Sequence, residues 1–188
     1  VWAWTRALME TQAARIHVVS AGTAQTLVTR LTQAAGISLE VIQHNRLTSL
    51  VVASRPWSLA TLPPQTILVA FSRQIVLALK NELERYHRSV SVIYGGLPPE
   101  VRRRQAARFA NRETEICVAT DAVGMGLNLP ADNVCFFETS KFDGLRSRPL
   151  LPGEVIQIGG RAGRFGLSSA GQIGALVHRG ENSLLVLA

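Results

Sequence analysis

Short apolar runs rich in β-branched residues alternate along the chain with longer stretches of helical character. The short runs predict β-strands, and the longer stretches predict helices that bury one face. The expected strands cover residues 17–21, 39–43, 50–53, 66–71, 90–94, 115–120, 133–138 and 172–178. The expected helices cover residues 24–35, 73–87, 99–111 and 154–164.

This alternation predicts the fold class. The run at residues 67–71 is almost continuously apolar, which is typical of a parallel strand buried on both faces. Pro98 and Pro99 stand at the start of the third helix, where a missing backbone N–H costs nothing. The order of elements therefore predicts an α/β domain with a doubly wound, mostly parallel sheet.

A domain boundary is expected near residues 44–48. The segment before it offers two expected strands and one complete helix, too little for a sheet of its own. We interpret residues 1–45 as the end of a preceding α/β domain and residues 46–188 as a second domain. Pro56, Pro63 and Pro64 predict a loop over residues 54–64.

The charge of the chain adds a candidate partner to this picture. The formal net charge is +7 and the isoelectric point is about 10.7, which favours a polyanion such as nucleic acid. Lys80 and Lys141 are the only lysines, so arginine supplies nearly all the positive charge. The planar guanidinium group suits bidentate phosphate contacts, although a GC-rich genome would produce the same bias.

The sequence also argues against a metal site and against a membrane partner. Cys117 and Cys135 lie in apolar runs without His or Cys at metal-ligand spacing, so we expect buried thiols and no metal site. No apolar run approaches the roughly 18–20 residues that span a bilayer, so we expect no membrane partner.

The strongest chemical signal is the sequence QIGGRAGR at residues 157–164. If it lies on the fourth expected helix, Arg161 and Arg164 project from the same side, and Gly160 and Gly163 leave them uncrowded. Such a pair can grip the oxygens of a transferring phosphoryl group, as arginine fingers do. The alternative is a glycine-rich turn with two solvated arginines.

The second signal is the sequence ATDAVGMGLN at residues 119–128. A buried strand delivers Thr120 and Asp121 at its carboxyl end, where open α/β sheets bind ligands. The two glycines that follow allow backbone N–H groups to approach a phosphate, and the Thr120 hydroxyl can donate to one. The alternative is an ordinary turn between a strand and a loop.

Together and in this order, the two sequences resemble motifs V and VI of superfamily-two helicases. The chain is most similar to ATP-dependent RNA helicases of the mitochondrial degradosome type and their bacterial relatives. Four further stretches support this resemblance: WAWTRAL from Trp2, VAFSR from Val69, VIYGGLPP from Val92 and KFDG from Lys141. The resemblance implies that the chain carries the end of a first RecA-like domain and the second, helicase C-terminal RecA-like domain.

The resemblance implies a role for several residues in ATP hydrolysis. Arg161 and Arg164 would reach the β- and γ-phosphates of ATP, and Gln157 would lie beside the γ-phosphate and its attacking water. Gly124, Gly126 and Asn128 would approach the nucleotide, with Asn128 near the ribose. Many relatives carry aspartate where Asn128 stands.

The resemblance also implies a nucleic-acid track. Ser72, Arg73, Gly95 and Thr120 would line the path of the RNA sugar–phosphate backbone. Arg102 matches an arginine of the family, with a solvated helix charge as the alternative. The run at residues 102–104 either contacts phosphates or forms a solvated face.

The parts that bind ATP most tightly are missing from this sequence. Neither Lys80 nor Lys141 follows a glycine-rich loop, so there is no Walker A sequence, and no acidic pair follows a strand as in Walker B. ATP and Mg²⁺ would therefore be held mainly by the first RecA-like domain of the full-length enzyme. The chain alone should be inactive.

Three readings compete with an RNA helicase. A non-catalytic RecA-like module would bind RNA or a partner without needing both arginines. A DNA helicase or translocase would use the same backbone contacts, which do not read the 2′-OH unambiguously. A generic dinucleotide-binding domain is disfavoured because no G-x-G-x-x-G follows the first strand of the domain.

The expected partners are single-stranded RNA, or DNA in the alternative, and the first RecA-like domain of the same chain. The family resemblance also suggests a ribonuclease partner. We expect a bacterial cytoplasmic protein, or a mitochondrial matrix protein if the source is eukaryotic.

Overall fold

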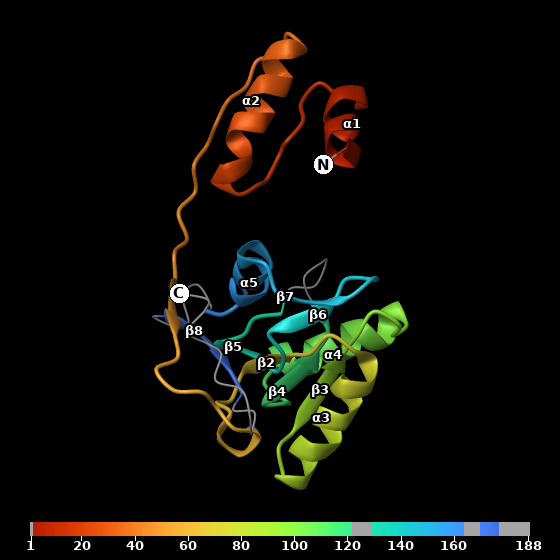
Figure 1. Cartoon of the computed structure of the whole chain (residues 1–188), viewed down its shortest axis with the longest axis vertical. Helices are drawn as coiled ribbons and strands as arrows, with labels where there is room; N and C mark the ends of the chain where they lie inside the picture. The colour runs from red at the N-terminus through yellow and green to blue at the C-terminus, as the bar shows by residue number, and fades with distance from the viewer. Residues whose placement is uncertain (1, 122–128, 164–169, 177–188) are drawn as a thin grey trace. The chain divides into compact units, whose positions relative to one another are not determined.

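The computed structural model describes residues 2–121, 129–163 and 170–176, which form two compact units (Figure 1). The units are Val1–Asn45 and Arg46–Ala188. Within the described ranges, no helix combines the length and apolar character that a bilayer crossing requires.

The described residues of the first unit form helices joined by irregular segments. It contains α1 (Trp2–Glu10), the 3₁₀ turn η1 (Gly22–Ala24) and α2 (Gln25–Ala34). No residue of α1 is buried, and α2 buries only Thr32, whose hydroxyl donates to the carbonyl oxygens of Val28 and Thr29. Two helices with so little buried surface do not make a core of their own.

The second unit is built on a six-stranded sheet. Its strands are β1 (Ser49–Val52), β2 (Thr66–Val69), β3 (Val90–Ile93), β4 (Ile116–Ala119), β5 (Asn133–Phe136) and β8 (Ala170–Ala175). They lie in the order β1-β8-β5-β2-β4-β3, and every neighbouring pair is parallel. The four residues of β2, β3, β4 and β5 are all buried, as expected for strands covered on both faces.

Helices cover both faces of this sheet (Figure 1). Side chains of α3 (Arg73–Arg85) join one apolar cluster, and those of α4 (Pro99–Ala110) and α5 (Pro152–Gly159) join another. The first cluster contains Val76, Leu79, Leu83, Leu68, Val118 and Cys135. The second contains Ala106, Phe109, Ile67, Cys117 and Val134, and the partly buried Ile158 packs against it. Alternate residues of each strand thus face opposite helices, which confirms the predicted doubly wound, mostly parallel α/β fold.

A small hairpin and a 3₁₀ turn complete the second unit. The antiparallel strands β6 (Ser140–Phe142) and β7 (Ser147–Pro149) pair with Lys141 opposite Arg148. The 3₁₀ turn η2 (Leu59–Thr61) lies within the expected loop and is capped by the Ser58 hydroxyl, which accepts from the Thr61 N–H. The hairpin leads directly into α5.

Two predicted strands and one helix end are wrong. Residues 17–21 and 39–43 form no strand, because an isolated apolar run has no neighbouring strand to satisfy its backbone groups there. The last helix ends at Gly159 and not at residue 164. It ends because Ala162 enters a β-bridge with Ala131 and Gly163 takes a positive φ of 86°, neither of which a helix permits.

Candidate functional site

The residues that the sequence predicts to contact nucleic acid lie at one edge of the sheet. β2, β4 and β3 are parallel neighbours, with Val69 and Ile93 both in register with Ala119. Ser72, Gly95 and Thr120 each follow the carboxyl end of one of these strands. Carboxyl ends of parallel strands are where open α/β sheets bind ligands, so the topology brings these residues together.

Ser72 and Arg73 open helix α3 at this edge. The Ser72 hydroxyl is the N-cap and accepts the Ile75 N–H at 3.1 Å. Its own proton is still available to donate. Arg73 is exposed, and its guanidinium carbon lies 5.2 Å from the centre of the Tyr94 ring. A capped helix N-terminus beside an oriented cation is a favourable environment for a phosphate.

Arg102 holds the loop that contains Gly95. Its Nη2 donates to the carbonyl oxygens of Gly95 at 2.7 Å and Leu97 at 3.2 Å, and the residue is half-buried. The side chain is therefore not a solvated helix charge. Its predicted contact with nucleic acid stays a prediction, because two loop carbonyls already occupy Nη2.

Thr120 lies at the end of β4, 9% exposed, and its N–H donates to the Ile93 carbonyl at 3.0 Å. This bond extends the β3–β4 ladder by one residue and fixes Thr120 at the edge. Asp121 follows it, and its carboxylate lies 3.7 Å from the Lys141 ammonium. The predicted nucleotide contacts Gly124, Gly126 and Asn128 lie outside the described residues, as does Arg164.

The predicted catalytic residues Gln157 and Arg161 lie on either side of the end of α5. Gln157 is an exposed residue of the helix, whereas Arg161 lies in the turn that follows it and is half-buried. Burial lowers the pKa of the Arg161 guanidinium, which is nevertheless cationic at neutral pH. Arg161 therefore projects from a turn, and not from the helix that the sequence predicts.

The backbone around Arg161 is held by three parts of the second unit. Arg46 donates to the carbonyl oxygens of Gly160 and Ala162, and the Gly163 N–H donates to the Ala131 carbonyl at 2.9 Å. At Gly171 of β8 the chains approach so closely that a Cβ would lie 2.4 Å from the Ala162 carbonyl carbon. Sequence reasoning missed Arg46, because nothing near it in the chain shows which carbonyls it reaches.

A cluster of ion pairs joins the hairpin to the start of α5. Glu154 accepts from Arg148 at 2.8 and 3.0 Å, and its carboxylate lies 2.6 Å from the Lys141 ammonium. It also accepts the Leu151 N–H at 2.8 Å. Hydrogen bonds from Arg148, and then from Lys141, hold the pKa of Glu154 well below its usual range. This cluster fixes the first turn of the helix that leads to Arg161.

The sequence offered only a partial signal for this cluster. Lys141 belongs to a stretch that supported the family resemblance, and Glu154 stands in the first turn after Pro152, where acidic residues are favoured. Their pairing with each other required the hairpin, which was not predicted. In the described part of the chain, no group of three or more His, Cys, Asp or Glu side chains is arranged to hold a metal ion.

Comparison with known proteins identifies the family of this chain. Residues 43–166 match the model of the helicase conserved C-terminal domain. The chain is 37% identical over 185 residues to the mitochondrial ATP-dependent RNA helicase SUV3 of Candida albicans, and 40% identical over 172 residues to that of Saccharomyces cerevisiae. These alignments cover 98% and 90% of this chain but 26% and 23% of the relatives. The chain thus spans about a quarter of the length of these relatives.

Solved structures agree on the fold. The C-terminal domain of the DEAD-box protein Dbp5 matches with a TM-score of 0.53 at 18% identity, over 71% of this chain and 78% of that one. The C-terminal part of the Fun30 ATPase domain matches with a TM-score of 0.51 at 19% identity, over 62% of this chain and 36% of that one. The sheet is thus that of a C-terminal RecA-like domain, and the chain belongs to the helicase conserved C-terminal domain family, as its resemblance to superfamily-two helicases predicted.

Proposed function

We propose that this chain is the second RecA-like half of an ATP-dependent RNA helicase. It contributes one side of a nucleic-acid track and the arginines that complete an ATP site. One observation carries the proposal: Ser72, Arg73, Gly95 and Thr120 lie at the carboxyl ends of three neighbouring parallel strands. Hydroxyl, guanidinium and backbone donors gathered at one edge suit a phosphodiester backbone.

In this proposal the track binds successive phosphates of a single strand. The Ser72 and Thr120 hydroxyls donate to phosphate oxygens, and Arg73 neutralises a phosphate charge at the start of α3. Arg102 keeps the Gly95 loop in its shape, since its guanidinium spans the carbonyls of Gly95 and Leu97. Contacts of this kind grip a strand without reading its sequence.

The arginines act on a nucleotide that is bound mainly by the first RecA-like domain. Bound ATP with Mg²⁺ supplies the phosphoryl group whose hydrolysis drives the enzyme. Arg161 and Arg164 stabilise negative charge on the phosphate oxygens, and the Gln157 amide orients the attacking water. The exposure of Gln157 and the cationic, half-buried Arg161 fit this role. Gly124, Gly126 and Asn128 are the proposed contacts to the rest of the nucleotide.

Closure of the two domains links these two functions. Nucleotide binding brings Arg161 and Arg164 against the phosphates, and hydrolysis releases them. The alternating grip at Ser72, Arg73 and Thr120 then moves the protein along the strand. Residues 1–45 are, in this proposal, the last part of the first RecA-like domain, and α1, none of whose residues is buried, agrees with packing against the rest of that domain.

The names of the relatives support RNA as the proposed substrate and the mitochondrion as the proposed location. The two SUV3 proteins are RNA helicases, which favours RNA over DNA for this chain. Both are mitochondrial, which favours the mitochondrial matrix; neither name supports the expected bacterial cytoplasm. A ribonuclease partner is proposed on family resemblance alone.

The direct test is duplex unwinding by the full-length protein. RNA and DNA duplexes of equal sequence, each with a single-stranded overhang, are incubated with ATP or with a non-hydrolysable analogue. We expect RNA strands to separate with ATP only. Unwinding of DNA alone would indicate the DNA translocase, and RNA binding without ATP turnover would indicate the non-catalytic module.

A further inference from the structure

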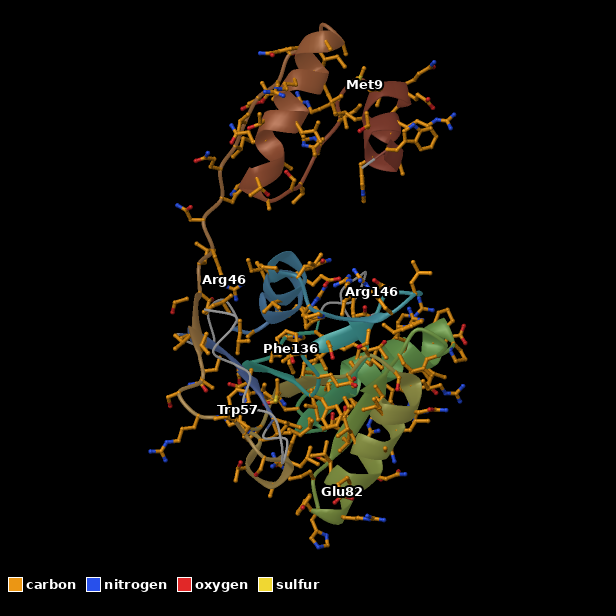
Figure 2. The ribbon with its side chains drawn as sticks, viewed as in Figure 1. Met9, Arg46, Trp57, Glu82, Phe136 and Arg146 are labelled. Atoms are coloured by element: carbon orange, nitrogen blue, oxygen red, sulfur yellow. The ribbon has the colours of Figure 1, made fainter. Side chains whose placement is uncertain are left out.

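Arg46 makes three hydrogen bonds to backbone carbonyls, and two of these carbonyls flank Arg161. Its Nε donates to the Thr48 carbonyl at 2.6 Å, and its Nη1 donates to the Gly160 carbonyl at 2.6 Å. Its Nη2 donates to the Ala162 carbonyl. Figure 2 labels Arg46 near α5, and the two carbonyls beside Arg161 lie just after the end of that helix.

The chemistry of a helix end explains why an arginine suits this position. The two carbonyls belong to Gly160, the C-cap of α5, and to Ala162 in the turn that follows, so they lie at the negative end of the helix dipole. A guanidinium presents several donors in one rigid plane, so it can join Thr48, Gly160 and Ala162 in a single geometry. A lysine ammonium is a point charge on a flexible stem and cannot fix all three carbonyls in the same way.

The position of Arg46 in the chain shows which segments this contact joins. Arg46 is the first residue of the second unit, directly after the end of the first unit at Asn45. The other restraints on the turn come from Ala131 and Gly171, deep in the second unit. Arg46 therefore connects the turn that carries Arg161 to the segment by which the chain enters this unit.

We propose that Arg46 is a positioning residue for Arg161. By holding the carbonyls on both sides of Arg161, it sets the direction in which that guanidinium meets a phosphate. This inference rests on the proposed function, since it assumes that Arg161 acts on ATP.

The chain offers a matched control in Arg88. Its Nε donates to the Glu115 carboxylate at 2.6 Å and its Nη2 donates to the Leu62 carbonyl at 2.9 Å. Arg88 thus also bridges separate segments, but it lies just before β3, the edge strand that β5, β2 and β4 separate from β8 and the turn beside it. Replacement of Arg88 should perturb the fold without perturbing the turn at residues 160–163, which carries Arg161.

The experiment compares Arg46→Gln and Arg46→Lys with Arg88→Gln and Arg88→Lys in the full-length protein. Three quantities are measured: kcat for ATP hydrolysis with single-stranded RNA, Kd for a fluorescent ATP analogue, and Tm. We expect Arg46→Gln to lower kcat by up to about 10²-fold, because small misplacements of a group that acts on the reacting atoms cost about that much. Arg46→Lys should lower kcat less, and Kd should not change. Both Arg88 variants should keep the wild-type kcat, even where Tm falls.

The outcomes separate this inference from the proposed function. Wild-type kcat in folded Arg46 variants, or an equal loss of kcat in the Arg88 variants, would overturn the positioning role. If Arg46→Gln does not fold, the kcat of Arg46→Lys tests the positioning role in its place. Arg161→Lys is measured in parallel: if it keeps full turnover, the proposed function itself fails, whereas if it alone loses turnover, only the role of Arg46 fails.

Discussion

Two regions of the second unit are organised in different ways. One is the strand-end edge, formed by Ser72, Arg73, Gly95 and Thr120, and the other is the arginine turn at residues 160–163. At the edge, each residue follows its own strand, so Ser72, Gly95 and Thr120 are positioned by the sheet itself. The turn at residues 160–163 lies beyond the end of α5 and is shaped by Arg46, Ala131 and Gly171. The edge is therefore fixed by the core, whereas the turn depends on a few contacts between segments distant in the sequence. The second arrangement suits the proposed role of Arg161, which is to meet phosphates only when two domains close.

The largest expected effect is on the chemistry of the turn. In the full-length protein, Arg161→Ala and Arg164→Ala should each lower ATP turnover about 10³–10⁵-fold, the range for loss of an arginine finger. Nucleotide binding should change little, because in the proposed function the first domain holds most of the nucleotide. Single-turnover hydrolysis, with nucleotide affinity measured alongside, checks this. Turnover that survives both changes would remove the turn from the mechanism.

The next effect concerns the close backbone approach beneath the turn. Gly171→Ala should destabilise the domain by about 3 kcal/mol, because its Cβ would meet backbone atoms that cannot move without distorting the core. Those atoms are the Ala162 carbonyl carbon at 2.4 Å and the Gly163 nitrogen at 2.5 Å. Urea unfolding measures the loss. Gly153→Ala is the control, since nothing lies within 4 Å of the added Cβ. Equal stability of the two variants would contradict the proposed tight contact.

A smaller effect is expected at the strand-end edge. Arg73→Ala should weaken binding of single-stranded RNA about tenfold and reduce the salt dependence of log K by about 0.7, the share of one phosphate contact. Fluorescence anisotropy at several salt concentrations measures both quantities. Arg85→Ala is the matched control, because Arg85 is exposed on the last turn of the same helix and pairs with Glu82, labelled in Figure 2. A change as large in the control would mean that general charge, and not the edge, governs binding.

The smallest effect is a dependence of stability on pH. The pKa of Glu154 is lowered in the folded protein, so its carboxylate stabilises the fold above the unfolded pKa of about 4.3, and this stabilisation is lost as the pH falls through the folded value. Glu154→Gln should therefore cost about 1 kcal/mol at pH 7, because the pairs are partly in solvent, and progressively less below pH 4. Thermal melts from pH 7 to pH 3 test this. A constant difference between variant and wild type across that range would contradict it.

The strands that form the edge were predictable from the sequence because their apolar runs are local signals. The runs that became β2, β3 and β4 were all predicted, and Thr120 was assigned to the carboxyl end of its strand. The other residues of the edge, Ser72, Arg73 and Gly95, were assigned by the family resemblance. The same reasoning failed at residues 17–21 and 39–43, where an apolar run has no neighbouring strand in the first unit. A run predicts a strand only where a sheet exists to receive it.

The turn was less predictable because its determinants are distant in sequence. Arg161 was predicted to project from a helix but lies in a turn, and the β-bridge between Ala131 and Ala162 that ends the helix has no local signal. Arg46 stands 114 residues from the Gly160 carbonyl that it contacts. The hairpin that joins Lys141 to Glu154 was missed because its strands are three residues long and mostly exposed.

The most direct test of the whole account is the RNA dependence of ATP turnover in the full-length protein. Turnover is measured against the concentration of single-stranded RNA for the wild type, Arg73→Ala and Arg161→Ala. The account predicts that RNA stimulates the wild type, that Arg73→Ala raises the RNA concentration needed for half-maximal turnover without lowering the maximum, and that Arg161→Ala abolishes the maximum without weakening RNA binding. Turnover in the wild type that does not respond to RNA, or an Arg161→Ala variant that loses only RNA affinity, would contradict the claim that the edge and the turn serve one ATP-driven RNA helicase.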